Sequence, residues 1–254
     1  MFIRAIKTKV FIPPKDDLLS VIKESFSKIQ LKEKSIFIIT SKVVSIWQGR
    51  CVTREEFPDK DQLIVKEADF YLDRKEIPNE YVMLTIKNNV LLPTAGIDES
   101  NAKGYYILLP QDPYKTAKQI YDFIQKEFNL KELGVIITDS RCTPLRRGTT
   151  GVALSYYGFN PLRDYRKTPD LFGRNYKVSV LNIADSLAVA GVLAMGEGSE
   201  QTPIAIVEDI DNVKFGNFKL EGNDSFDMNP DFDIYAPLLK GMKWKKGEGG
   251  LKNN

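Results

Sequence analysis

The sequence predicts a mixed α/β fold, in which mixed β-sheets are flanked by helices. Its first 40 residues follow a strand–helix–strand pattern, Pro113–Phe128 has the apolar periodicity of a long helix, and Gly134–Thr138 is a strongly apolar strand. Because a strand–helix–strand unit joins parallel strands, part of the sheet is expected to be parallel. A chain of 254 residues can form one large domain or two small ones.

The amino-terminal elements are predicted from simple periodicities. Residues 4–10 alternate in polarity like a half-buried strand, and Ser35–Thr40 is a second, short apolar strand. Between them, Asp16 or Asp17 can cap a helix. The apolar residues of this helix recur at helical spacing and are Leu18, Leu19, Ile22, Phe26 and Ile29.

The next part of the chain is predicted to add one helix and three strands. Thr53–Lys75 is rich in charge but carries an apolar stripe, which indicates a peripheral helix. The strands are Val82–Ile86, Val90–Pro93 and Tyr105–Leu109, and the polar loop Thr94–Lys103 separates the last two.

The second half of the chain begins with the clearest helix, Pro113–Phe128, in which the proline suits the first turn. The apolar strand that follows is expected to end abruptly at Asp139. The remaining expected elements are a strand Val152–Tyr157, a polar insertion Asn160–Asn175, a strand Tyr176–Leu181, an apolar helix Ile183–Met195 and a strand Pro203–Glu208. Residues 1–240 are expected to form one domain, or two interleaved subdomains. Residues 241–254, rich in Gly, Lys and Asn, are expected to be a disordered tail.

The composition argues against several classes of protein. The 36 basic and 34 acidic residues are interspersed, and the net charge of +2 does not indicate a nucleic-acid partner. The longest stretch without polar side chains, Leu187–Met195, is far shorter than the roughly 20 residues that cross a bilayer, and the amino terminus lacks the pattern of a signal peptide. Two cysteines, Cys51 and Cys142, are too few for a disulfide framework. We therefore expect a cytoplasmic protein that binds neither membranes nor nucleic acids.

The chain contains no histidine, and this absence excludes whole mechanisms. Ser-His-Asp and Cys-His nucleophiles need an imidazole base, and most catalytic zinc sites use imidazole ligands. Catalysis would therefore depend on carboxylates, hydroxyls, lysine, arginine, backbone amides or a bound metal ion. The sequence also lacks a Walker A loop, a kinase signature and a dinucleotide-binding glycine motif.

Three loops combine an acidic residue with glycine or hydroxyl groups directly after an apolar element. They are residues 94–101 with Asp98, residues 138–141 with Asp139, and residues 195–200 with Glu197. Carboxylates that converge from separate loops repel one another by about 1–4 kcal/mol per close pair, and a divalent cation would reverse this repulsion. Asp, Glu and Ser supply the hard oxygen ligands that Mg²⁺ and Mn²⁺ prefer. Alternatively, Asp98 and Asp139 cap turns or helices and Glu197 is solvated.

The loop of residues 141–151 contains Arg141, Arg146 and Arg147 beside glycines and hydroxyls. Arginine can bind a carboxylate or phosphate in bidentate geometry, and glycine lets backbone amides approach an anion closely. Because the loop follows Asp139, it is expected to place positive charge beside a metal site, as phosphoryl transfer requires. Alternatively, it is a solvated basic loop that pairs with surface acids.

Several short motifs, taken together and in their order along the chain, resemble the coenzyme F-420-0:L-glutamate ligase family of γ-glutamyl ligases. The resemblance extends from about Arg4 to Glu208. The segments that carry it are Ala95–Asn101, Gly134–Ser140, Arg146–Gly148, Asp170–Arg174, Ala184–Asp185 and Met195–Gly198.

The resemblance implies an intertwined homodimer and a ligase that uses GTP and divalent metal ions, Mn²⁺ or Mg²⁺, with K⁺ as a further candidate cation. Such an enzyme would join L-glutamate to the carboxylate of an acceptor, coenzyme F-420-0, through an acyl phosphate. This chemistry needs no histidine, because metal ions and arginine neutralise the charge on the transferred phosphoryl group.

The resemblance also assigns roles to residues. The metal ligands that it implies are Asp98 and Asp139 for one ion and Ser140 and Glu197 for a second. The catalytic residues are Asp139, Arg146 and Arg147. The residues that match nucleotide contacts are Phe11, Ile12, Pro13, Ser41, Lys42, Asn101 and the stretch Met195–Thr202, in particular Met195, Gly196, Gly198 and Ser199.

The chain departs from this family at two places. Members that act on F-420-0 commonly carry lysine where this chain has Ile46, and a glycine before the loop arginine where it has Ser140–Pro144. A missing ammonium removes a phosphate contact of about 1.5–3 kcal/mol, and Lys42, one helical turn earlier, can replace it. The nearest alternative function is γ-glutamyl ligation to a folate (tetrahydrofolate). Alternatives of other classes are a non-catalytic nucleotide-binding protein and a nucleic-acid-binding protein.

Overall fold

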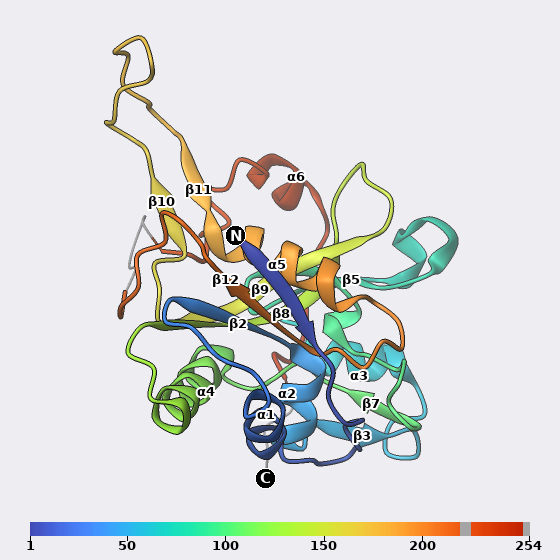
Figure 1. The fold of residues 1–254 in the computed structure, drawn as a ribbon. Helices are drawn as coiled ribbons and strands as arrows, with labels where there is room; N and C mark the ends of the chain where they lie inside the picture. The colour runs from blue at the N-terminus through green and yellow to red at the C-terminus, as the bar shows by residue number, and fades with distance from the viewer. Residues whose placement is uncertain (219–224, 251–254) are drawn as a thin grey trace.

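The chain folds around one large mixed sheet, as Figure 1 shows. The structure is a computed structural model and describes residues 1–218 and 225–250. From one edge to the other, the strands of the large sheet are β1 (Phe2–Ile6), β12 (Ile204–Glu208), β2 (Ser35–Thr40), β8 (Leu133–Cys142) and β9 (Thr149–Tyr157). β2 and β8 are parallel, and the other neighbours are antiparallel. The predicted mixed α/β fold class is therefore confirmed.

Helices cover both faces of this sheet (Figure 1). They are α1 (Leu18–Phe26), α2 (Ser41–Gln48) and α4 (Pro113–Phe128) on one face and α5 (Ile183–Met195) on the other. The side chains of β2 alternate between the two layers, because Phe37 and Ile39 pack with the first group of helices whereas Ile36 and Ile38 pack with α5. Burial on both faces explains why the central strands are continuous apolar runs in the sequence.

A second group of short elements forms the small lobe, which we define as residues 50–109 together with residues 245–250. Its elements are β3 (Cys51–Thr53), α3 (Lys60–Glu67), β4 (Phe70–Leu72), β5 (Leu84–Lys87), β6 (Val90–Pro93), β7 (Tyr105–Ile107), β13 (Lys245–Lys246) and the 3₁₀ turns η1 (Arg74–Glu76), η2 (Pro78–Glu80) and η3 (Thr94–Gly96). The strands β13, β4, β5 and β6 make an antiparallel sheet, and β3 pairs with β7. A separate apolar cluster, which includes Leu63, Ile64, Ala95 and Ile97, joins α3 to the turn η3.

The predicted peripheral helix over Thr53–Lys75 is wrong both in extent and in burial. This stretch contains the end of β3, then α3, β4 and η1. Asp59 starts α3 by accepting a hydrogen bond from the amide of Asp61, and the extended backbone of Ala68 stops it. Leu63 is fully buried, so α3 is part of the core of the small lobe.

The predicted disordered tail is wrong for residues 241–250, and residues 251–254 lie outside the described part of the chain. Gly241 ends the short helix α6 (Ala236–Gly241), and β13 pairs with β4. We call residues 245–250 the carboxy-terminal strap. The amides of residues 247, 248, 249 and 250 donate to the carbonyls of residues 69, 65, 68 and 66, at the carboxyl end of α3. A helix leaves its last carbonyls without helical partners, so the strap caps α3.

Other predicted elements are confirmed or shifted by a few residues. β2, β6, α4 and α5 begin and end where they are predicted, but the strand predicted over residues 4–10 is β1 at Phe2–Ile6. The strand predicted at Tyr176–Leu181 is shorter and forms β11 (Val180–Asn182). It pairs with β10 (Leu162–Asp164), and the two strands lie at the base of an arm that projects from the body (Figure 1). In the part of the chain that the structure describes, no helix has both the length and the hydropathy of a membrane span.

Strand β8 differs from its prediction at the position where the candidate site lies. It does not end at Asp139 but continues to Cys142, and it pairs with β9 on both sides of a bulge between Ile137 and Thr138. Asp139 and Ser140 therefore belong to a paired strand. Successive strand residues point to opposite faces, so these two side chains diverge.

We expect Gly247→Ala to destabilise the protein by about 1–3 kcal/mol, because the added methyl group would overpack the strap. A Cβ atom at this position would lie 2.1 Å from the backbone oxygen of Ala68. Urea unfolding followed by circular dichroism measures the loss. Gly241→Ala is the matched control, since a Cβ atom there meets no described atom within 4 Å. Equal free energies of unfolding for the two variants would contradict the close packing of the strap.

Candidate functional site

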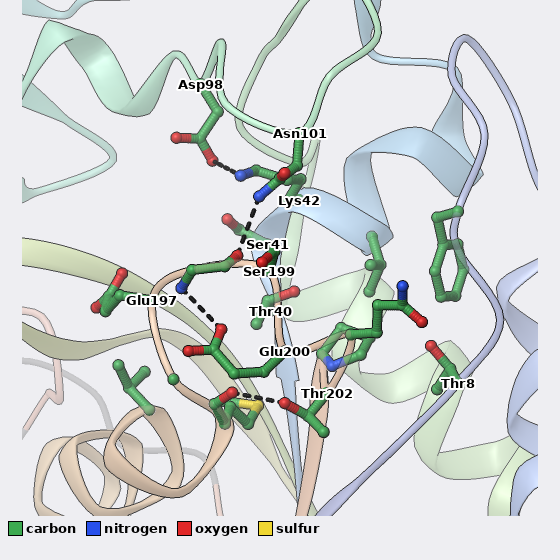
Figure 2. Close-up of a pocket in the computed structure, with 18 of the residues that line it drawn as sticks. Thr8, Thr40, Ser41, Lys42, Asp98, Asn101, Glu197, Ser199, Glu200 and Thr202 are labelled. Carbon is green, nitrogen blue, oxygen red and sulfur yellow. Dashed lines mark hydrogen bonds and ion pairs between the residues drawn. The ribbon is translucent and has the colours of Figure 1, made fainter.

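A cavity of about 280 Å³ lies where the carboxyl ends of β2 and β8 meet the small lobe (Figure 2). Ligands of α/β sheets bind in crevices outside the carboxyl ends of the strands, so this cavity is the candidate site. Its walls come from the segment after β1, the start of α2, the loop after η3, the end of β8 and the loop that follows α5. The predicted site residues that line it are Phe11, Ser41, Lys42, Asp98, Asn101, Asp139, Ser140, Met195, Gly196, Glu197, Gly198 and Ser199.

The structure leaves other predicted site residues outside this cavity. Ile12, which is exposed, and Pro13 do not line it. Arg146 and Arg147 lie in the exposed loop between β8 and β9. Because β8 continues three residues beyond Asp139, at about 3.3 Å per residue, the hairpin carries this loop roughly 10 Å further along the strand. The expected arginine clamp beside Asp139 is therefore absent from the described cavity lining.

The start of α2 forms one wall and is suited to bind an anion. α2 begins at Ser41, directly after β2, and within the described structure Thr40 makes no side-chain cap. The first amides of such a helix are available to a ligand, and the helix dipole favours negative charge there. Lys42 adds a cation: its Nζ lies 3.2 Å from Asp98 Oδ2 and donates to the carbonyl of Ser100 at 3.1 Å (Figure 2).

Asp139 lies in an environment that disfavours a carboxylate. Burial, and then the charge of Asp98, raise the pKa of Asp139 from 3.8 to about 7. The amide of Ser140, which donates to Asp139 Oδ1 at 2.8 Å, lowers this pKa, as do Lys42 and the hydroxyl of Ser41, but these contacts do not offset the burial. The pKa of Asp139 is therefore raised chiefly by burial and further by the neighbouring carboxylate of Asp98.

Ser140 points away from Asp139 and reaches the loop after α5. Its Oγ donates to Glu197 Oε1 at 2.6 Å, and Thr149 Oγ1 donates to the same oxygen at 3.4 Å. The predicted metal ligands thus form two pairs, Asp98 with Asp139 and Ser140 with Glu197. Among the described residues, no three His, Cys, Asp or Glu side chains are grouped closely enough to hold a metal ion. Each pair would need further oxygen ligands from a nucleotide or from water.

The loop of residues 195–202 is connected to the small lobe across the cavity (Figure 2). Asn101 Nδ2 donates to the carbonyl of Gly198 at 3.0 Å, and the amide of Gly198 donates to Glu200 Oε2 at 2.8 Å. Thr202 Oγ1 donates to the carbonyl of Met195 at 2.6 Å and closes the loop at its base. Side chains therefore bind both the carbonyl and the amide of Gly198.

Sequence reasoning did not single out Thr8, which also lines the cavity. Glu200 and Thr202 line it too, and they belong to the stretch Met195–Thr202 that the resemblance matches to nucleotide contacts. Thr8 follows β1, and its amide donates to the carbonyl of Gln201 at 3.0 Å. Only the antiparallel pairing of β1 with β12 brings Thr8 here, and no sequence pattern marks it.

Part of the cavity lining is apolar. Phe11, Val43 and Ile46 contribute to it, and Ile46 is only 2% exposed. The same cavity contains the two acidic pairs and the start of α2. This combination fits a ligand that joins a flat apolar ring to phosphate groups.

The family model for F420-0:gamma-glutamyl ligase matches residues 5–209, which contain every residue of the cavity lining. The coenzyme F420:L-glutamate ligase of Methanopyrus kandleri is 31% identical over 212 residues, which cover 77% of this chain and 81% of that relative. The protein of the same name from Methanocaldococcus jannaschii is 31% identical over 211 residues, or 78% of this chain and 84% of the relative. That of Haloarcula marismortui is 29% identical over 252 residues, or 90% and 93%.

These matches cover most of the chain and include both acidic pairs, the start of α2 and the loop after α5. They agree with the resemblance seen in the short motifs. The chain therefore belongs to the F420-0:gamma-glutamyl ligase family and is a ligase.

Proposed function

We propose that this protein is a GTP- and divalent-metal-dependent γ-glutamyl ligase that joins L-glutamate to the carboxylate of coenzyme F-420-0. One observation carries the proposal: two pairs of oxygen-bearing side chains meet an uncapped helix start in a single cavity. The names of the relatives, coenzyme F420:L-glutamate ligase, support this amino acid and this class of acceptor.

The nucleotide would bind with its phosphates at the start of α2 and its base against the apolar lining. Ser41 and Lys42 lie at the helix start, and Phe11 belongs to the apolar part. Asn101 and the loop of residues 195–199 line the same cavity and would complete the contacts. Because Ile46 offers no charge, Lys42 is the residue that we assign to the phosphate charge.

The donor set fits Mn²⁺ or Mg²⁺. Asp98 with Asp139, and Ser140 with Glu197, offer only oxygen ligands, which these ions prefer. When bound, such ions supply Lewis-acid stabilisation of the charge on the phosphate oxygens. K⁺ is a further candidate cation for the same oxygen-rich cavity.

The proposed reaction has two displacements. An oxygen of the acceptor carboxylate forms a bond to the γ-phosphorus of GTP, the bond from that phosphorus to the bridging oxygen breaks, and GDP leaves. The amine of glutamate then forms a bond to the acyl carbon, the carbon–oxygen bond to phosphate breaks, and inorganic phosphate leaves with loss of one proton from the amine. Lys42 and the amides of α2 would stabilise the transferred negative charge.

Arg146 and Arg147 would act on the acceptor rather than on the nucleotide. They are exposed at the end of the β8–β9 hairpin, outside the cavity, and arginine binds carboxylates and phosphates in bidentate geometry. An anionic acceptor that extends out of the cavity along β8 would approach these two arginines.

We propose a homodimer as the active assembly. Leu171 and Phe172, at the tip of the arm, are 97% and 95% exposed, and Leu193 on the outer face of α5 is 84% exposed. Large exposed apolar side chains are typical of protein–protein contacts. The arm would reach the second copy of the chain and give the intertwined form that the resemblance implies.

The activity is tested with purified protein, GTP, Mn²⁺, L-glutamate and either F-420-0 or tetrahydrofolate, with products identified by mass spectrometry. We expect F-420-0 to gain glutamate with release of GDP and phosphate. Product from tetrahydrofolate alone would favour the folate alternative, for which the apolar Ile46 in place of lysine is the specific observation. Nucleotide binding without any glutamylated product would identify a non-catalytic homologue.

We expect Asp139→Asn to lower kcat at least about 100-fold, because the amide cannot supply an anionic metal ligand. Steady-state kinetics with saturating GTP and Mn²⁺ measures the loss. Asp122→Asn is the matched control, since Asp122 lies outside the cavity and pairs with Lys118 on the surface of α4. Undiminished turnover in Asp139→Asn would contradict the metal role.

We also expect Asp139→Asn to stabilise the metal-free protein at pH 8 by about 1 kcal/mol or more, and to change little near pH 4. The pKa of Asp139 is raised from 3.8 to about 7 by folding, so the unfolded chain loses this proton first as the pH rises. The wild type therefore loses stability between these two pH values, and the asparagine variant does not. Urea unfolding at both pH values, with a chelator present, measures the difference. A variant no more stable than the wild type at pH 8 would contradict the raised pKa of Asp139 in the folded protein.

A further inference from the structure

The loop that presents Asp98 to the cavity begins with an unusual turn. Thr94, Ala95 and Gly96 have φ angles of +53°, +50° and +70°, so three consecutive residues are left-handed and two of them are not glycine. L-residues with a Cβ atom rarely adopt this conformation, and such strain persists only where the surroundings impose it. Some contact must therefore hold the turn.

That contact is a buried hydroxyl on β5. The amide of Ala95 donates to Thr85 Oγ1 at 2.8 Å, and the same hydroxyl donates to the carbonyl of Leu92 at 2.7 Å. Thr85 is fully buried, and Leu92 is its partner in the pairing of β5 with β6. The hydroxyl thus uses both its donor and an acceptor position to join the turn to a paired strand.

The surroundings leave the turn little room to relax. Ala95 is 1% exposed and packs in the core of the small lobe. A Cβ atom on Gly96 would lie 2.6 Å from the side chain of Leu109. The amide of Thr94 donates to the carbonyl of Met83 at 2.8 Å, so the turn is anchored at its start as well.

The turn leads directly to the cavity. Asp98 follows Gly96 by two residues and exchanges two backbone hydrogen bonds of 2.9 Å with Ile107, and its side chain meets Lys42. A change of the backbone at Ala95 would therefore displace the carboxylate of Asp98 relative to Asp139, on the other wall of the cavity.

We propose that Thr85 is a positioning residue for Asp98. Its hydroxyl holds the left-handed turn and so sets the separation of Asp98 from Asp139, although Thr85 does not line the cavity. The inference rests on the proposed function for the metal role of Asp98. Residues that orient a metal ligand from behind commonly affect metal affinity about 10- to 100-fold.

The test compares Thr85→Val, which keeps the shape but removes the hydroxyl, with Thr85→Ser, which keeps the hydroxyl. Binding of Mn²⁺ alone is measured from the loss of the free-ion signal in electron paramagnetic resonance. We expect Thr85→Val to weaken binding about tenfold or more and Thr85→Ser to stay within about threefold of the wild type. In the ligase assay, Thr85→Val should raise the half-saturating Mn²⁺ concentration more than it lowers kcat.

Thr116→Val controls for a general loss of stability. Thr116 is also buried, and its hydroxyl donates to backbone carbonyls at the start of α4, outside the cavity. This variant should unfold more easily and yet bind Mn²⁺ like the wild type. Equal Mn²⁺ affinity in Thr85→Val and Thr116→Val would overturn the proposal, and so would a Thr85→Ser variant as impaired as Thr85→Val.

Hydrogen exchange separates this inference from the proposed function. We expect the amides of residues 95–98 to exchange faster in Thr85→Val than in Thr85→Ser, whatever the metal chemistry. If the wild type binds no Mn²⁺ but this difference is seen, the proposed metal site fails while Thr85 still positions the turn. Identical protection in the two variants would overturn the role of Thr85.

Discussion

The candidate site depends on one backbone interaction, the pairing of β8 with β9 beyond the bulge between Ile137 and Thr138. Because the strand stays paired, Asp139 and Ser140 occupy successive positions and point to opposite faces. One reaches toward Asp98 in the small lobe, and the other bonds to Glu197 after α5. A strand that ended at the bulge would leave both side chains on a loop, with no fixed relation between the two acidic pairs.

A second constraint is the distribution of charge in a site without imidazole. The cavity brings together carboxylates from three separate parts of the chain, and burial together with the charge of Asp98 raises the pKa of Asp139. A cation bound beside Asp98 and Asp139 would offset the repulsion between these two carboxylates. Ligand binding and protein stability are coupled through these same carboxylates.

The sequence predicts an element well where its buried apolar residues recur at regular spacing along that one helix or strand. α4 matches its prediction because its apolar stripe faces one core and Pro113 starts it, and β2 matches because both of its faces are buried. The three acidic segments do meet in one cavity, but from different elements: Asp139 from β8, Glu197 from the loop after α5, and Asp98 from the small lobe. The arginine loop does not, since Arg146 is close to Asp139 along the chain but separated from it by an extended hairpin. The strap could not be predicted either. Its composition is typical of a polar tail, and what orders it is contact between Gly247 and the end of α3, about 180 residues earlier in the sequence.

The strap also determines when the small lobe can be completed during synthesis. Residues 50–109 form most of this lobe, but the carbonyls at the end of α3 are capped by residues 247–250. On the ribosome the large sheet can gain all five of its strands once Glu208 has emerged, while the lobe that carries Asp98 still lacks its edge strand β13. The nascent chain can therefore form its core before residues 245–250 complete the small lobe.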